Sequence, residues 1–535
     1  MKMLEKILLY CRTVRYLKKE QLVYQVLVRM GWKCTLNNKL KYESKVKDIQ
    51  LLTGNKELNY DEVFINRFNI DELMQNIITL LYETETLSLG KEWTFPNKSP
   101  LWNHNIHYFE YLFPLAKKYE ETGDFVYVEK IKELITAWID DNPMGTKNSS
   151  WACYPVALRL SNWIDIYSIL YKEFSSDSNF NTFFLNSLYS QYVFLVKHLE
   201  KHLMANHYFE DLRSIIIGSV FFKDNDTCEM AKRELITQCK EQILDDGFQY
   251  ERSPMYQKIL TEDLIKVVNA LQVKGEESVF FKKTIGQMLN VSYSLENSIN
   301  RIPLFNDCGN NITKSLQSIV EAAKNMDIYP YRRNSFISSG FYIYDFGERE
   351  ECRMIVDAGQ PGPSYSPGHS HNECMSYELF ISGKPIIVNC GTYAYQTKKR
   401  KMYKSALSHN TVRIAGFEQS EFWSSFRLAR RATVSKIKYD KTSICMGIND
   451  YLNNQIERTI YIADDNITVV DRAPNKEIES FIHCMKNQST DISIEEGNYS
   501  IEYISYAEEF GSEDKVKTYL IKGNGEIRYS IHIRG

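Results

Sequence analysis

The chain has 535 residues, of which 43% are hydrophobic and 25% are charged, as is ordinary for a soluble globular protein. That length exceeds what one compact core accommodates, so we expect two or three domains. The net charge of −3 excludes nucleic-acid binding driven by overall charge, and the 11 scattered cysteines, which form no CxxC pair, are typical of a reduced cytosolic protein.

Residues 1–60 are expected to form a helical N-terminal extension. The opening run MKMLEKILLYCRTVRYLKKE lacks the hydrophobic region and the cleavage site of a signal peptide. Its basic amphipathic pattern predicts a helix packed on the body of the protein, and peripheral contact with a membrane surface is the alternative. No stretch reaches the roughly 18–20 apolar residues of a membrane span. We therefore expect a cytoplasmic protein.

Residues 61–328 have the apolar spacing of helices. Segments such as YVEKIKELITAWIDD and ALRLSNWIDIYSILYKEF place apolar residues at i, i+3, i+4 and i+7, and short polar or Gly/Pro breaks separate them. Successive helices without strands predict a helical toroid. The absence of a strict sequence repeat disfavours a plain solenoid.

Residues 329–535 change to a strand pattern, after a linker near MDIYPYRRNS. Short runs such as SGFYIYDFG, HNTVRIAG and GEIRYSIHIRG are rich in β-branched and aromatic residues and are separated by Gly, Asn and Asp. This pattern predicts an antiparallel β-sandwich. A helical domain followed by a sandwich would leave a cleft between the two, and such clefts are common ligand sites.

The first candidate site segment is WACYPVALRLSNWI, where Arg159, Asn162 and Trp163 fall within about one helical turn. A cation, an amide and an indole on neighbouring faces would line a sugar-binding groove. A 13% aromatic content, with 36 Tyr and 27 Phe, suits such a groove. The alternative is a buried Trp163 beside an Arg159 on the surface.

The second segment is ANHYFEDLRS, in which Asn206 and His207 open a predicted helix and Glu210 follows. The free N–H groups at a helix start favour an anion, and an asparagine there can donate a hydrogen bond to a substrate carboxylate. The alternative is an asparagine that only caps the helix, with a solvated histidine.

The third segment is DDGFQYERSPMYQ, where Gly and Pro interrupt helical sequence and predict an irregular region. Such regions often carry active residues, and Tyr256 is the candidate. Nearby cations would lower its pKa from about 10 toward that of a working acid or base.

The fourth segment is GHSHNECMSYELF, which contains His369 and His371. Asn389 in IIVNCGTY and His409 in SHNTV follow at intervals that separate β segments can bring together. Two imidazoles and one oxygen suit Zn²⁺ or Mn²⁺. The alternative is that these side chains only form hydrogen bonds with loop backbone.

At these motifs the chain resembles the heparinase II/III family of polysaccharide lyases. The match runs from LWNHNIHYFEYL to SEFWSSFRLARRA, and it includes NHYFE, ERSPMYQ, GHSHNECMSYELFISGKPIIVNCGTY and SHNTV. The resemblance implies an incomplete (α/α) toroid followed by an antiparallel β-sandwich, with an acidic polysaccharide or oligosaccharide bound between them.

The resemblance also implies roles for individual residues. By position, the catalytic residues would be Asn206, which also binds the substrate carboxylate, His207, Tyr256 and His369, and the metal ligands would be His371, Asn389 and His409. Glu210 matches a glutamate found in some members. With the groove residues Arg159, Asn162 and Trp163, and with Trp423, it makes up the expected substrate-binding set. The family commonly has Asp where this chain has Asn389, which weakens the case for a bound Zn²⁺, Mn²⁺ or Ca²⁺ ion. Because it lacks a signal peptide, the sequence resembles the leaderless members associated with surface-polysaccharide gene clusters. That resemblance argues against heparin itself as the substrate.

The chemistry that would need these residues is removal of the C5 proton of a uronic acid. The adjacent carboxylate must first be hydrogen-bonded or neutralised, and Asn206 with a histidine suits that task. Elimination of the C4 oxygen would make the protein a polysaccharide lyase, with Tyr256 as the acid. Reprotonation from the opposite face would make it a uronyl C5-epimerase. A glycoside hydrolase and a non-catalytic polysaccharide-binding protein are further alternatives.

Overall fold

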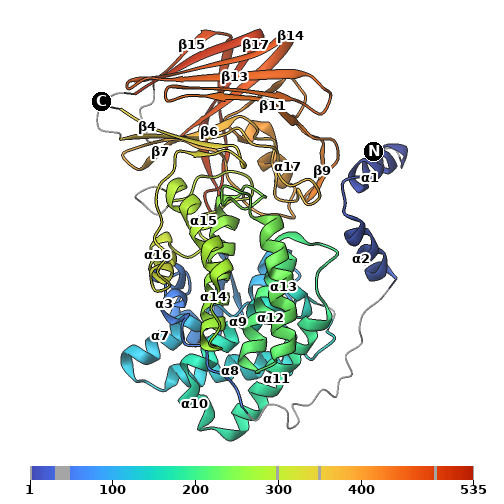
Figure 1. Ribbon diagram of the computed structural model, residues 1–535, viewed down its shortest axis with the longest axis vertical. Coiled ribbons are helices and arrows are strands. Elements are labelled where there is room, and N and C mark those ends of the chain that lie inside the picture. Colours follow the sequence, from blue (N-terminus) through green and yellow to red (C-terminus); the bar gives the residue numbers. More distant parts are fainter. Residues whose placement is uncertain are drawn as a thin grey trace.

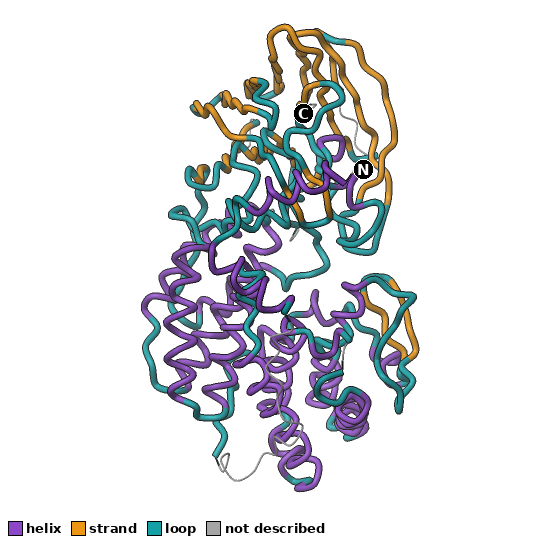
Figure 2. The backbone as a smooth tube through the Cα atoms, turned by 90° about the vertical axis from the view of Figure 1, so that its right-hand side faces the viewer, coloured by secondary structure: helices purple, strands orange, loops and turns teal. Residues whose placement is uncertain are grey.

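The computed structural model describes residues 3–30, 48–146, 148–296, 301–347, 351–486 and 491–533. Helices fill one end of the molecule and strands fill the other, and Figures 1 and 2 show the two parts meeting along a layer of loops. We call these the helical part and the sheet part. Within the described ranges, no helix combines the length and the apolar character that crossing a bilayer requires.

The helical part consists of helices that pack on their neighbours in the fold, with α9 against α11 and α12, α12 against α13 and α14, and α14 against α15. Its elements are α3 (Lys56–Asn59), α4 (Glu62–Ile65), α5 (Ile70–Met74), β1 (Ile77–Leu80), β2 (Glu83–Thr86), α6 (Pro100–Asn105), α7 (Leu112–Thr122), α8 (Val126–Asp141), η1 (Ser149–Trp151), α9 (Cys153–Ile169), α10 (Tyr171–Ser175), α11 (Ser178–Lys197), α12 (Ala205–Phe221), α13 (Asn225–Gln242), α14 (Pro254–Val273), α15 (Val279–Leu295) and α16 (Leu316–Lys324).

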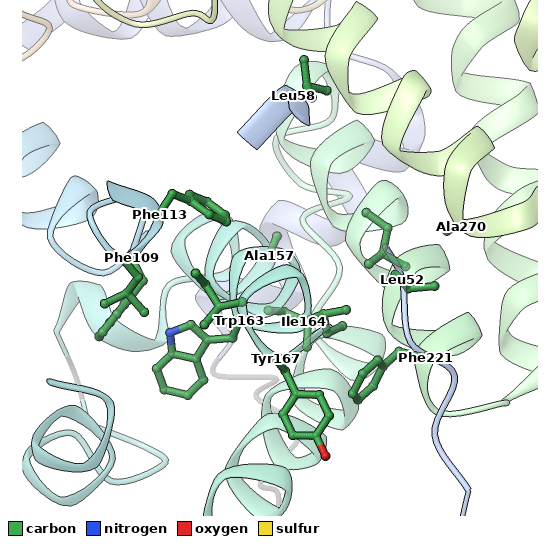
Figure 3. Packing of buried hydrophobic residues seen from close by; sticks show 14 of the residues in the cluster. Leu52, Leu58, Phe109, Phe113, Ala157, Trp163, Ile164, Tyr167, Phe221 and Ala270 are labelled. Carbon is green, nitrogen blue, oxygen red and sulfur yellow. The ribbon is translucent and has the colours of Figure 1, made fainter. Parts of the chain in front are cut away.

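A large apolar cluster, part of which is drawn in Figure 3, holds these helices together. Trp163 on α9 lies at its centre, with its ring centroid 5.1 Å from that of Phe109 and 5.5 Å from that of Trp138. Tyr167, one turn further along α9, contacts Phe221 at the end of α12. The helical periodicity therefore reflects burial on more than one side of α9, as expected for a helix inside a multi-helix body.

One short hairpin corrects the prediction that this part contains no strands. β1 and β2 pair antiparallel from Ile77 to Thr86. Ile78 and Leu80 alternate with less buried residues, which is the period of a strand, and Leu81 and Tyr82 adopt positive φ at the turn. The four-residue strand IITL was too short for its period to be separated from that of the surrounding helices.

The sheet part is built around one antiparallel network of 13 strands. Its elements are β3 (Ser335–Phe336), β4 (Phe341–Phe346), β5 (Cys352–Asp357), β6 (Ser376–Ile381), β7 (Lys384–Ile387), α17 (Arg400–Tyr403), η2 (Ala406–Ser408), β8 (Val412–Ile414), β9 (Phe422–Ser424), β10 (Arg427–Leu428), β11 (Thr433–Tyr439), β12 (Ser443–Asn449), β13 (Gln455–Ile462), β14 (Asn466–Cys484), β15 (Asp491–Glu496), β16 (Asn498–Tyr506) and β17 (Asp514–His532), of which β9 and β10 form a separate hairpin.

The long strands β14 and β17 form the backbone of this network. They pair along nearly their full length, with a register shift between Arg472 and Glu477 that lets the pair bend. β14 also pairs with β7, β8 and β13, so one strand connects the two halves of the sheet. Inward-facing aliphatic residues of these strands form the second large core.

The start of α14 is tied to both parts of the molecule. Arg252 donates a hydrogen bond from Nε to the carbonyl of Ser339 at 2.9 Å, and Ser253 donates from Oγ to the carbonyl of Asp307 at 2.6 Å. The amide of Asp307 in turn donates to the carbonyl of His369 at 3.1 Å. These bonds fix the loop that carries His369 against the helix that carries Tyr256.

The N-terminal helices α1 (Met3–Val14) and α2 (Lys19–Arg29) bridge the two parts, and we call residues 3–30 the N-terminal strap. Figure 2 shows α1 beside the sheet part, where Arg12 pairs with Glu421 at 3.0 Å. On the helical side, Gln21 at the start of α2 donates from Nε2 to the carbonyl of Leu203 at 3.2 Å. Residues 3–30 of the predicted extension thus form helices that pack on the body of the protein, and residues 31–47 of it lie outside the described ranges.

Candidate active site

A cavity of about 740 Å³ lies where the helical part, the sheet part and the N-terminal strap meet. Asn206 and His207 of α12, Tyr256 of α14 and His369 of the sheet part all line it. The structure therefore brings the four residues predicted to be catalytic to one place, although they are spread over more than 160 positions of the chain.

The backbone adopts positive φ directly before Asn206 and in the segments that lead to Tyr256 and Asp307. Met204 and Ala205, directly before Asn206, have φ of 60° and 53°, and Arg252, ahead of the first turn of α14, has φ of 58°. Asn306, next to Asp307, has φ of 56°. Residues other than glycine rarely adopt this region, and such conformations concentrate at functional sites.

Asn206 and His207 occupy the first turn of α12, as the sequence predicted. His207 is linked to a buried carboxylate, with 2.9 Å between its Nδ1 and Oε2 of Glu200. Burial lowers the pKa of His207, but the charge and hydrogen bond of Glu200 outweigh it and raise the pKa above its usual value. The cavity wall therefore holds a histidine that carries positive charge more readily than a free one.

Tyr256 lies in the first turn of α14, where its backbone N–H donates to the capping Ser253 Oγ at 3.2 Å. Its hydroxyl shares a hydrogen bond of 3.0 Å with the hydroxyl of Tyr395. Burial, together with Tyr395, raises the pKa of Tyr256 well above its usual value. Tyr256 is therefore a protonated phenol in the free site. The cations that the sequence reasoning invoked to lower this pKa do not act on it here.

His369 lies beside Tyr256, with 4.4 Å between the two ring centroids. Its Nδ1 donates to Oδ2 of Asp307 at 2.8 Å, so Nε2 is the nitrogen available to a ligand. Burial lowers the pKa of His369 despite the nearby carboxylate. A neutral histidine held in one tautomer by a carboxylate has the arrangement of a general base.

Asp307, Arg400 and Tyr395 are site residues that the sequence reasoning missed. Although burial raises the pKa of Asp307, Arg400, His369 and His371 lower it well below its usual value. Arg400 donates from Nη2 to Oδ2 of Asp307 at 2.6 Å and forms a second hydrogen bond to Oδ1. Asp307 is 62 positions from His369 and 93 from Arg400, so no local motif joins the three.

The predicted substrate-binding set is only partly near the cavity. Asn162 lines it. Arg159 and Trp163 are fully buried in the helical core instead, where the guanidinium of Arg159 lies 3.8 Å from the ring centroid of Trp138. The expectation that Arg159 and Trp163 line a groove is corrected, because α9 is buried on the side that carries them.

Glu210 and Trp423 are also occupied elsewhere. Glu210 is buried and pairs with Arg213, one turn along α12, so that Arg213 lines the cavity and Glu210 does not. Trp423 donates from its indole Nε1 to Oγ1 of Thr13 at 3.0 Å and packs against Tyr10. Both side chains act here as support for the walls of the cavity.

The predicted metal ligands lie behind His369. His371 and His409 are adjacent, with 3.1 Å between His371 Nδ1 and His409 Nε2. Asn389 does not offer its oxygen to them: Oδ1 accepts from Ser376 Oγ at 2.8 Å and from the amide of Asn410 at 3.1 Å. The asparagine therefore fits a metal poorly, whereas the two imidazoles and the neighbouring buried Glu373 have the chemistry of a divalent-cation donor set.

Comparison with known protein families gives matches over almost the whole chain. The model described as heparinase II/III N-terminus matches residues 16–335, and the model described as heparinase II/III-like, C-terminal, matches residues 330–516.

Individual relatives are more distant. The heparin-sulfate lyase of Pedobacter heparinus is 22% identical over 358 residues, which is 60% of this chain and 53% of that protein. The heparin-sulfate lyase of Bacteroides stercoris is 21% identical over 434 residues, 71% of this chain and 63% of that protein. This chain thus spans little more than half the length of the curated relatives that it matches.

Solved structures share the fold. A heparinase III crystal structure has a TM-score of 0.66 and 16% sequence identity, and the match covers 95% of this chain and 89% of that one. A chondroitin AC lyase from Streptomyces coelicolor has a TM-score of 0.53 and 8% identity, with 89% of this chain and 79% of that one covered. This chain and these structures share one architecture, in which a helical N-terminal part is joined to a C-terminal antiparallel sheet part.

Proposed function

Because the chain belongs to the heparinase II/III family, we propose that it is a polysaccharide lyase that cleaves a uronate-containing polysaccharide by β-elimination. The observation that carries the proposal is the shared cavity of Asn206, Tyr256 and His369. A donor for the carboxylate, a proton donor and a proton acceptor are the three groups that the reaction needs.

The uronate carboxylate would bind beside Asn206. Removal of the C5 proton places a second negative charge next to the carboxylate, so donors that are already oriented contribute most at that point. The Asn206 amide supplies such a donor at the start of α12. His207, whose positive charge Glu200 supports, would neutralise part of the developing charge.

His369 and Tyr256 would divide the proton transfers. His369 Nε2 takes the C5 proton, the electron pair forms the C4–C5 double bond, and the C4–O bond breaks with the proton of the Tyr256 hydroxyl going to the leaving oxygen. The hydrogen bond from His369 Nδ1 to Asp307 supports the base, and the protonated state of Tyr256 supports the acid. If Tyr256 alone were both base and acid, its buried phenol would first have to ionise, and its raised pKa opposes this.

The proposed substrate is wider than that of the named relatives. Those proteins are called heparin-sulfate lyases, and this chain would act on an acidic polysaccharide or oligosaccharide. Arg427 and Arg431 of the sheet part line the cavity and would face acidic groups of neighbouring sugars. Arg67, Lys266 and Lys314 line it from the helical part, although Glu110 and Glu262 partly neutralise them.

The proposal includes a finer description of the fold. The helical part would be an incomplete (α/α) toroid and the sheet part an antiparallel β-sandwich, with the substrate held between them. The packing of successive long helices from α9 to α15 supports the toroid, and the all-antiparallel pairing around β14 supports the sandwich.

The test is incubation of the protein with several uronate polymers while the ultraviolet absorbance of a 4,5-unsaturated uronate is recorded. A lyase produces this absorbance, and Tyr256→Phe should lower the rate by about 10²–10⁴-fold while substrate binding persists. Deuterium uptake at C5 without absorbance would instead identify a C5-epimerase, and new reducing ends alone would identify a hydrolase. An unimpaired Tyr256→Phe variant would contradict the role of Tyr256.

A further inference from the structure

A second cluster of chemical groups lies behind the active site, around Glu373. This carboxylate is 2% exposed, and neither of its oxygens forms a hydrogen bond within the described residues. Its Oε2 lies 3.1 Å from Nδ1 of His409, which is fully buried and also lacks a hydrogen-bond partner among those residues. A buried carboxylate that faces a bare imidazole nitrogen needs a cation or a proton between them.

The hydrogen bonds of the two histidines leave lone pairs that face this point. His371 donates from Nε2 to Oδ1 of Asp307 at 2.8 Å, so its Nδ1 carries the lone pair, and His409 Nε2 lies 3.1 Å from that atom. His409 has Nε2 near the carbonyl of Tyr403, at 3.2 Å, and donation to that oxygen leaves Nδ1 bare. One ligand atom from each of His371, Glu373 and His409 lies within 4.8 Å of the other two.

We propose that His371, Glu373 and His409 form a divalent-cation site, with Glu373 in place of Asn389 as its oxygen ligand. Asn389 is excluded because Ser376 and Asn410 already occupy its oxygen and because its Nδ2, a donor, would repel a cation. Two imidazole nitrogens and one carboxylate match Zn²⁺, which takes such ligands at about 2.0–2.2 Å and accepts a fourth from solvent. Ca²⁺ takes roughly 6–8 oxygen ligands, which these residues do not supply.

The site would act by positioning. His371 and His369 bind the two oxygens of the same carboxylate, Asp307, and are separated by one residue. An ion held by His371 would therefore fix the orientation of the loop that presents His369 to the cavity. This consequence rests on the proposed function, but the existence of the site does not, because metal binding is measured without substrate.

The experiment loads the purified full-length protein with Zn²⁺, removes free metal by dialysis and measures bound metal by mass spectrometry. The matched variants are Glu373→Gln and Asn389→Ala. We expect about one Zn²⁺ per chain in the wild type and in Asn389→Ala, and an affinity at least about tenfold lower in Glu373→Gln. Circular dichroism checks that each variant is folded.

A second readout uses Co²⁺ in place of Zn²⁺, because its visible absorption reports the ligand set directly. Glu373→Gln should change this spectrum and Asn389→Asp should leave it unchanged. If Glu373→Gln does not fold, the Asn389→Asp spectrum and the wild-type stoichiometry still decide the matter. If the wild type binds no metal, the proposal is wrong and a proton lies between Glu373 and His409. If Asn389→Ala loses the metal and Glu373→Gln keeps it, Asn389 is the oxygen ligand instead.

Discussion

At the scale of single residues, the hydrogen bonds of the cavity assign different proton states to its acids and bases. Tyr256 is protonated because burial opposes its ionisation, and His369 keeps a free nitrogen because Asp307 binds the other one. A proton donor and a proton acceptor thus lie side by side. The hydroxyl of Tyr395 is the nearest hydrogen-bond partner that orients the Tyr256 hydroxyl.

The change Tyr395→Phe should lower kcat roughly tenfold and leave KM nearly unchanged. One hydrogen bond of about 1–1.5 kcal/mol that orients Tyr256 is lost, and no charge is buried or exposed. Steady-state kinetics on an oligosaccharide substrate measure the effect. Tyr393→Phe, in the same loop but outside the cavity lining, is the matched control and should behave like the wild type. Equal rates for Tyr395→Phe and the wild type would remove Tyr395 from the site.

We expect Glu251 to give the stability of the protein a pH dependence. Burial, and then the charge of Asp307, raise its pKa to about 8. A carboxyl group with a raised pKa contributes stability that is fully present below its usual pKa of about 4.3 and is lost as the pH rises through about 8. In its neutral form, Glu251 also suits a cavity that receives a carboxylate.

Glu251→Gln should therefore be about as stable as the wild type near pH 5 and more stable above about pH 8, because glutamine cannot ionise. Thermal unfolding of both proteins across this pH range measures the difference in their stability. The other titrating groups are the same in both proteins, so their contributions cancel. A constant difference at all pH values would show that Glu251 is ionised normally.

At the scale of secondary structure elements, α14 is attached to its neighbours through buried charges. Glu262 on this helix contacts Lys266, one turn later, at 3.1 Å, and Lys314, which precedes α16. Burial raises the pKa of Glu262, but the two lysines outweigh it and lower the pKa to about 2. Lys266 and Lys314 are themselves buried, so loss of the glutamate would leave two charges without their main partner.

Glu262→Gln should lower the free energy of unfolding by about 3 kcal/mol at neutral pH. A depressed carboxyl pKa contributes stability that is present above the usual value of about 4.3 and is lost as the pH falls toward about 2, so the difference should shrink in acid. Urea unfolding at neutral and acidic pH provides the measurement. Glu277→Gln, an exposed change in the turn after α14, should have no effect at either pH.

At the scale of the whole molecule, the N-terminal strap joins the two parts and also forms a wall of the cavity. Tyr10, Thr13 and Leu22 of the strap line the same cavity as the proposed catalytic residues. α1 is held to the sheet part through Trp423, while α2 is held to the helical part. Substrate access therefore depends on a segment that side-chain contacts hold to the body at both of its helices.

Trp423→Ala should loosen the strap and raise KM several-fold with little change in kcat, because the change removes a wall of the cavity and no reacting group. Limited proteolysis near the N-terminus should become faster in parallel. Tyr461→Ala, which removes an exposed ring from the outer face of β13, is the control for loss of an aromatic side chain. If proteolysis of the strap becomes faster but KM stays normal, the strap does not shape the cavity.

The sequence by itself determined the features that depend on neighbouring residues. The change from helical to strand spacing placed a helical part before a sheet part, and short motifs named Asn206, His207, Tyr256 and His369, which share one cavity. The order of the two parts could be predicted because helix and strand periods are local, and the motifs could be noticed because the ends of elements are where the chain can present side chains to a ligand.

The tertiary structure alone decided what the rest of the chain does around these residues. Asp307 meets His369 and Arg400 only after distant segments pack together. Arg159 and Trp163 have the pattern of a groove, but neighbouring helices cover their side of α9. Asn389 lies at the expected position, yet its oxygen is already bound and the free carboxylate belongs to Glu373. Burial and the pairing of polar atoms arise from packing between distant segments, which no local pattern encodes.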